Sequence, residues 1–161
     1  MRTLSLAILL AGLCVAPSRS GDLPSKSVLP LGYAKEIVAA AEAEAARRGA
    51  TVVIAVVDDG GHLIALHRLD DTQVASVEGG IGKARTAAIF RRPSKVFEDQ
   101  IRDGRVASLA LPGATPLQGG LPIVANGKVI GAIGVSGNTP QEDEDIAKAG
   151  AAKAEALLAG K

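Results

Sequence analysis

Apolar residues form two consecutive runs in the last third of the chain, and the dipeptide Asn126-Gly127 separates them. Residues 121–125 precede the dipeptide and residues 128–135 follow it. Asn-Gly most readily adopts the two positive-φ positions of a tight turn, so the pattern predicts a β-hairpin. Both faces of the second run are apolar or small, which predicts that other elements cover the hairpin from both sides.

A second pair of runs predicts another hairpin. Residues 51–57 are β-branched and apolar, too hydrophobic for an exposed edge, so we expect a central strand. The Asp and Gly residues at 58–61 are typical of a turn, and residues 62–69 would return beside the first strand. Strands joined as hairpins pair antiparallel, so the two hairpins predict an antiparallel sheet.

Other segments show the apolar spacing of helices. The first ends before Gly49, a typical glycine at a helix C-terminus. The last begins at a capping box formed by Thr139 and Glu142, with proline at the first helical position. The predicted helices cover residues 31–48, 73–90, 95–102 and 140–158.

The middle of the chain is less regular. Three glycines weaken the helix predicted at 73–90, so it should begin late or pack very tightly; they are Gly79, Gly80 and Gly82. Ser94 is placed to cap the short helix that follows, and residues 106–118 predict a loop of the length that often carries function. The whole pattern predicts a single-domain α+β fold, an antiparallel β-sheet with packed helices.

The N-terminus has the organisation of a secretory signal peptide. Arg2 precedes an apolar run over residues 4–15, and small residues at Ser18 and Ser20 suit cleavage before Gly21. The run is short for a membrane span, and a retained anchor is the alternative. We expect residues 1–20 to be removed on export to the periplasm or the medium, leaving residues 21–30 as an extended lead-in and no membrane attachment.

Composition excludes several classes of function. Cleavage after residue 20 would take Arg2 and Arg19 from the 18 basic residues, leaving 16 against 17 acidic ones, and would remove the single cysteine. The exported form would then have no disulfide and no thiolate nucleophile. A near-neutral balance with 2% aromatic residues also argues against nucleic-acid binding, which needs a basic surface and stacking side chains.

Few residues can ligate a metal or heme iron. The chain has only two imidazoles, His62 and His67, and one phenol, Tyr33. The histidines are an odd number of residues apart on one predicted strand, so they should point to opposite faces and cannot share a zinc ion. His67 would share its face with Leu63 and Ala65, an apolar setting suited to a porphyrin, whereas a structural role for His67 is the alternative.

Basic residues offer a second chemistry. Arg68 could form a strand-end ion pair with Asp70, or could hold the carboxylate of a ligand. Lys83, one helical turn from Thr86, has the same two interpretations. Gly119 and Gly120 could present backbone amides to an anion but lack the lysine and hydroxyl of a phosphate loop. The sequence predicts no catalytic residues and no metal site.

Five blocks stand out when the chain is read in order: IAVVDDGGHL, ALHRLD, GKARTAAIFRRPS, PLQGGLPIVANGKVIGAIGVSG and QEDEDIAKAGAAKA. Together they resemble the GlcG/HbpS-like family, which includes extracellular heme-binding proteins, proteins of glycolate-utilisation operons and a domain of some corrinoid adenosyltransferases.

The resemblance covers residues 31–159 and implies a profilin-like or PAS-like fold, assembly into homo-oligomers and, for some members, heme binding. It places Thr115, Gly119 and Gly120 beside the ligand cleft and makes Arg68 and Lys83 the basic positions. It does not select the iron ligand, which leaves His67, His62 and Tyr33 as candidates.

Three hypotheses follow. The first is an exported, oligomeric protein that binds heme or a related tetrapyrrole and is not an enzyme. The alternative is an accessory protein or enzyme of small hydroxy-acid metabolism of the glycolate type, with Arg68 and Lys83 holding a carboxylate. The third is a structural or sensory protein without a ligand, for which a sensor kinase would be the partner.

Overall fold

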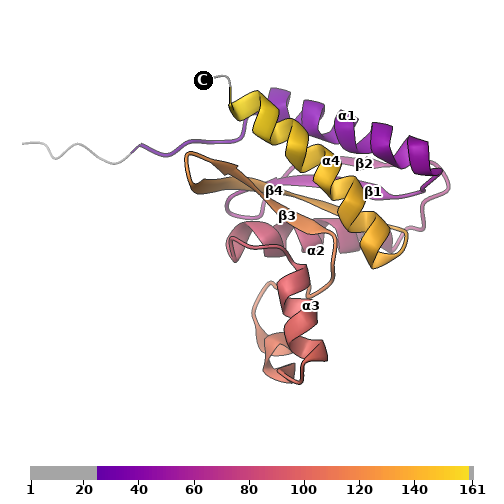
Figure 1. The fold of residues 1–161 in the computed structure, drawn as a ribbon, viewed down its shortest axis with the longest axis vertical. Helices are drawn as coiled ribbons and strands as arrows, with labels where there is room; N and C mark the ends of the chain where they lie inside the picture. The colour runs from indigo at the N-terminus through magenta and orange to yellow at the C-terminus, as the bar shows by residue number, and fades with distance from the viewer. Residues whose placement is uncertain (1–24, 160–161) are drawn as a thin grey trace, which may run out of the picture.

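The computed structural model describes residues 25–159, which form a four-stranded sheet and helices packed on both of its faces (Figure 1). The strand order is β2-β1-β4-β3, and every pairing is antiparallel. The elements in chain order are α1 (Leu31–Arg48), β1 (Val53–Asp58), β2 (Leu63–Arg68), α2 (Ser76–Ile89), α3 (Lys95–Arg102), η1 (Val106–Ala110), β3 (Gly120–Ala125), β4 (Lys128–Ser136) and α4 (Pro140–Leu158). The predicted antiparallel α+β fold is confirmed.

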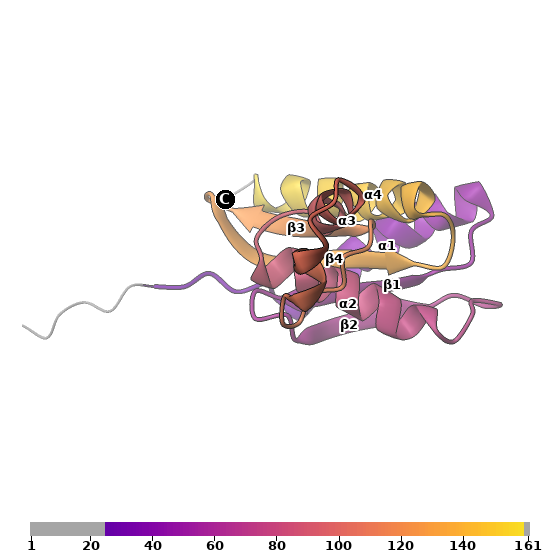
Figure 2. The same cartoon turned by 90° about the horizontal axis from the view of Figure 1, so that it is seen from below.

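The helices form two layers around the sheet. Helices α1 and α4 pack together on one face, and α2 lies on the other (Figures 1 and 2). The larger apolar cluster fills the space under α1 and α4, and a smaller one, rich in alanine, lies between the sheet and α2. The expectation that both faces of the sheet are covered is therefore correct.

The central hairpin forms as predicted. Asn126 and Gly127 adopt φ values of 50° and 73°, the positive values that a tight turn requires. Strand β1 pairs with β2 on one side and β4 on the other, so the apolar run at 51–57 does form a central strand. Strand β3 is an edge strand and contains Pro122, which has no backbone N–H to donate.

Three helices, α1, α3 and α4, have the predicted bounds, and local capping signals mark the C-terminus of α1 and the N-terminus of α4. Gly49 follows α1 in the left-handed conformation, with φ of 64°. At α4 the capping box is complete: the Thr139 side chain accepts from the Glu142 N–H, and the Glu142 carboxylate accepts from the Thr139 N–H at 3.3 Å. Helix α2 begins at Ser76 rather than Gln73, so it does begin late.

Helix α2 also packs very close to the sheet. A methyl group at Gly134 would lie 2.3 Å from the Gly80 carbonyl oxygen, and one at Gly82 would lie 2.3 Å from Thr115 Oγ1. Real side-chain contacts do not reach such distances, so only glycine allows this approach. The glycines that weaken α2 as an isolated helix thus stabilise its contact with β4 and the loop.

Two local predictions are wrong. The Ser94 side chain does not cap α3; its Oγ donates to the Leu117 carbonyl at 2.5 Å and accepts from the Gly120 N–H at 2.9 Å. In β2 the register shifts, so that Ala65 pairs with Val56 but Leu63 pairs with Val57. Leu63 therefore lies on the face opposite His67, because the extra residue in a bulge reverses the alternation of side chains.

The predicted signal peptide at 1–20 lies outside the described residues, and so does the start of the lead-in at 21–30. Residues 25–30 form no regular element. Within 25–159 no helix has the length and apolar character needed to cross a membrane.

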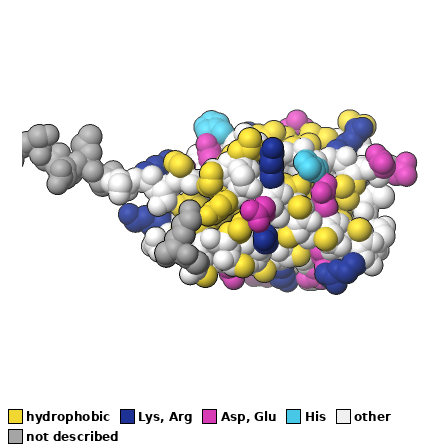
Figure 3. Space-filling model, turned by 90° about the horizontal axis from the view of Figure 1, so that it is seen from above, with side chains coloured by type: hydrophobic (Ala, Val, Ile, Leu, Met, Phe, Trp, Pro, Cys, Tyr) yellow, Lys and Arg dark blue, Asp and Glu magenta, His cyan; other side chains and the backbone are white. Residues whose placement is uncertain are grey.

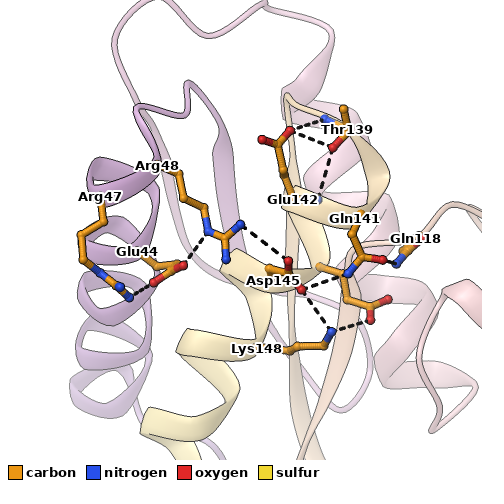
Figure 4. Close-up of polar contacts among 10 residues, drawn as sticks. Glu44, Arg47, Arg48, Gln118, Thr139, Gln141, Glu142, Asp145 and Lys148 are labelled. Atoms are coloured by element: carbon orange, nitrogen blue, oxygen red, sulfur yellow. Dashed lines mark hydrogen bonds and ion pairs between the residues drawn. The ribbon is translucent and has the colours of Figure 1, made fainter.

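A polar network fastens α4 to its neighbours (Figure 4). Arg48 of α1 binds Glu44 at 2.5 Å and Asp145 of α4 at 3.6 Å. Gln141 donates to Asp145 at 3.0 Å and accepts from Gln118 at 3.2 Å. The network therefore connects α1 and α4 with each other and with the loop before β3.

Candidate functional site

The structure separates the residues that the sequence singled out into three places. Thr115, Gly119 and Gly120 pack against α2, the helix that contains Lys83. The two histidines and Arg68 lie on or beside edge strand β2, and Tyr33 lies in the first turn of α1. Each place offers a different chemistry.

Lys83 forms a buried ion pair with Asp143. Its Nζ lies 2.6 Å from Asp143 Oδ2 and 3.0 Å from the Val135 carbonyl oxygen. The two side chains are only 5% and 3% exposed. Burial raises the pKa of the Asp143 carboxyl, and the hydrogen bond from Lys83 counteracts that rise. Lys83 therefore links α2, β4 and α4, and it can bind a ligand only if its ion pair with Asp143 breaks.

The glycine pair packs against this ion pair and does not face an open cleft. A methyl group at Gly120 would lie 2.1 Å from the Lys83 carbonyl oxygen, and one at Gly119 would lie 2.7 Å from the Val135 carbonyl oxygen. The sequence suggested the Gly120 N–H as a hydrogen-bond donor to an anion, but in the structure this group donates to Ser94 Oγ. Thr115 is held similarly, since its N–H donates to Thr86 Oγ1 at 2.7 Å.

His67 has the arrangement of an oriented metal ligand. Its Nδ1 lies 2.6 Å from Glu42 Oε1 of α1, and the side chain is 50% exposed. Histidines that bind metals commonly turn one ring nitrogen to a carboxylate, which leaves Nε2 as the ligating atom. The exposure of His67 shows that this chain alone gives the ring no apolar enclosure.

His62 is exposed in the turn before β2, where its N–H donates to Asp58 Oδ1 at 2.8 Å. The two histidines form separate patches in the space-filling view (Figure 3). No cluster of three or more potential metal ligands occurs within the described residues.

Arg68 and Lys83 do not form a joint carboxylate site. Arg68 pairs across the sheet with Val53, whose side chain contacts α2, so Arg68 lies on the α2 face. Its guanidinium makes no ion pair with Asp70 or with any other residue of the described part. The Arg68 guanidinium is thus exposed and makes no ion pair with the described residues, whereas Lys83 is paired with Asp143.

Two hollows lie at the tip of the central hairpin, and sequence reasoning did not find them. The Tyr33 hollow has a volume of about 520 Å³, and the Arg91 hollow one of about 540 Å³. Both lie in the range of small-molecule pockets. Residues common to the two are Ser27, Val124 and Ile130.

The two hollows differ in character. Besides these residues, the Tyr33 hollow is lined by apolar Val28, Pro30 and Leu158 and by Glu155. Charged residues line the Arg91 hollow, namely Lys26, Asp59, Arg91 and Lys128. No sequence motif marks either one, because the lead-in, α1, the end of α2 and the hairpin are far apart in the chain.

Comparison with known proteins gives concordant similarities. The family model described as haem degrading protein HbpS-like matches residues 29–152. Protein GlcG of Escherichia coli K12 is 45% identical over 114 residues, which are 71% of this chain and 85% of GlcG.

Solved structures are also similar. A double mutant of Streptomyces reticuli HbpS is 30% identical with a TM-score of 0.76, covering 92% of this chain and 97% of that one. The crystal structure of a PduOC:Heme complex is 25% identical with a TM-score of 0.72, covering 79% of this chain and 95% of that one. The whole domain, rather than one motif, is thus shared with these proteins.

Proposed function

We propose that the chain, which belongs to the family described as haem degrading protein HbpS-like, is an exported protein that binds heme or a related tetrapyrrole. The single observation that carries the proposal is the likeness of the whole domain to PduOC, which was solved as a heme complex. We propose a binding role and no enzymatic step.

The residues present are compatible with heme. Proteins hold heme iron with histidine, cysteine, methionine or tyrosine, and the described residues offer His62, His67 and Tyr33. The Tyr33 hollow adds apolar walls and a volume suited to a small molecule. When bound, heme would supply an iron centre that can change its oxidation state.

Heme titration tests the proposal. The purified protein, titrated with hemin, should give a saturable shift of the Soret band with a defined stoichiometry. The same protein unfolded in urea is the control, because a site built by the fold should give no saturable shift once the chain is unfolded. A native sample without a saturable shift would refute heme binding.

We propose carboxylate binding as the second candidate function, in an accessory protein or enzyme of small hydroxy-acid metabolism. Its support is Arg68, an exposed guanidinium without an ion pair in the described part of the chain. A ligand that binds the folded state raises the melting temperature. Stabilisation by glycolate-like acids but not by porphyrins, lost in Arg68→Gln, would favour this function over the first.

Self-association is part of the proposal. The segment 95–119, which contains α3 and η1, projects from the sheet (Figures 1 and 2). Three large apolar side chains on it are mostly or half exposed: Val106 at 64%, Leu109 at 66% and Leu117 at 49%. Contact between copies would remove them from water. Light scattering should show an oligomer, and Leu109→Glu should shift it toward the monomer.

Export and signalling complete the proposal. The pattern of residues 1–20 supports export, and cell fractionation with N-terminal sequencing of the recovered protein tests it. A protein that remains in the cytoplasm with Met1 in place would refute export. A sensor kinase is the partner that a sensing role requires, and co-purification with such a kinase in the presence and absence of hemin tests that role.

A further inference from the structure

The Arg91 hollow contains cations that no protein group neutralises. Lys26 is paired with Asp59 at 2.7 Å. The side chains of Arg91 and Lys128 make no hydrogen bond or ion pair with the residues of 25–159. After the one internal pair is counted, the hollow keeps two positive charges, which suits a ligand with two anionic groups.

Arg91 is also held in a backbone conformation that arginine rarely adopts. It follows α2 with φ of 54°, at the position where helices commonly end with a left-handed glycine. A non-glycine residue in this region is strained, and such strain concentrates at functional sites. Glycine would relieve the strain, but it would also remove the charge from the hollow.

The adjoining Tyr33 hollow offers an apolar wall and an oxygen ligand. Val28, Pro30 and Leu158 line it together with the half-buried Tyr33. Phenolate oxygen is one of the groups that hold heme iron in proteins. Val124 and Ile130 line both hollows, so an apolar surface continues from Tyr33 to the two cations.

We infer that the hairpin tip is the tetrapyrrole site: the macrocycle lies against the wall shared by the two hollows, Tyr33 ligates the iron, and Arg91 and Lys128 bind the two carboxylates of the ligand. The inference rests on the proposed function and selects among its candidate ligands. It assigns the lead-in at 25–30, which lines both hollows, to the binding site. His67 and His62, which line neither hollow, have no part in it.

Spectra of ligand variants test the role of Tyr33. The ferric hemin complex of the wild type should have the absorption and electron paramagnetic resonance signature of tyrosinate-ligated high-spin iron. Tyr33→Phe should lose this signature, and Tyr33→His should replace it with that of imidazole-ligated iron. His67→Ala and His62→Ala remove the two rival candidate ligands, and the inference requires that both leave the spectrum unchanged.

Affinity tests the two cations. Arg91→Gly and Lys128→Gln should each weaken hemin binding about fivefold, the effect of losing one exposed charge pair of about 1 kcal/mol. Arg91→Gly should melt at or above the wild-type temperature, which separates binding from folding. Arg105→Gln, which removes an exposed charge outside both hollows, should bind hemin as the wild type does.

The outcomes are distinct. A wild type with saturable binding whose spectrum is unchanged by Tyr33→Phe, or is lost in His67→Ala, would overturn the inference and leave the proposed function intact. A wild type without saturable binding would overturn the proposed function itself. Equal affinities of Arg91→Gly, Lys128→Gln and Arg105→Gln would refute the carboxylate contacts.

Discussion

Replacing Lys83 by methionine should destabilise the protein severely. The substitution keeps most of the side-chain volume but leaves the Asp143 carboxylate, 3% exposed, without its cation. Removing one partner of a buried ion pair costs about 3–5 kcal/mol, and the Val135 carbonyl also loses a donor. We expect a loss of about 4 kcal/mol, a large part of the 5–15 kcal/mol typical of a domain.

The loss should depend on pH. Burial raises the pKa of Asp143 above its ordinary 3.8, and Lys83 counteracts the rise, so Lys83→Met should raise this pKa further. An acid with a raised folded-state pKa favours folding below its unfolded pKa, and this advantage is lost as the pH rises through the folded-state value. The penalty of Lys83→Met should therefore be smaller near pH 4 than at pH 7.

Urea unfolding followed by circular dichroism measures both effects. With an m-value of about 2 kcal/mol/M, 4 kcal/mol corresponds to a midpoint about 2 M lower. Lys35→Met, an exposed lysine outside the ion pairs of the structure, is the control and should change the midpoint little. Lys83→Met combined with Asp143→Leu should recover part of the loss. A Lys83→Met penalty below 1 kcal/mol, or one that is equal at both pH values, would refute the reasoning.

Three further predictions concern stability and use the same assay. Gly120→Ala should cost at least 1–3 kcal/mol because the new methyl would lie 2.1 Å from the Lys83 carbonyl oxygen, and an unchanged midpoint would contradict the packing described. Gly32→Ala in α1, where a methyl meets no atom within 4 Å, should instead stabilise by about 0.5–1 kcal/mol, and destabilisation would show a contact absent from the structure. Thr139→Ala should cost about 1 kcal/mol at pH 7. Hydrogen bonds from Thr139 lower the pKa of Glu142 below its ordinary 4.5, so their stabilisation is present above pH 4.5 and is lost as the pH falls through the folded-state pKa. The difference in unfolding free energy between Thr139→Ala and the wild type should therefore become smaller in acid. A difference that stays constant with pH would contradict the capping box.

Local signals explain what the sequence predicted well. The ends of α1 and α4 depend on Gly49 and on the Thr139 capping box, and the central hairpin depends on Asn126-Gly127, all within a few residues of the element they define. The central position of β1 was also predicted, because the most apolar run takes the most buried place.

Contacts between distant segments explain what the sequence did not show. Lys83 and Asp143 are 60 residues apart, so nothing near either one indicates the other. The two hollows require the lead-in, the end of α2 and the hairpin to meet. The bulge in β2 reversed the face of Leu63 because one extra residue changes the parity on which the prediction depended.

Both margins of the sheet resist extension by another chain. Pro122 interrupts the row of hydrogen-bond donors along β3, and the bulge twists β2 away from a flat template. Copies of this protein are thereby discouraged from joining into continuous β-structure, as in fibrils. An assembly of copies would therefore depend on contacts between the side chains of helices and loops, and not on strands shared between neighbouring sheets.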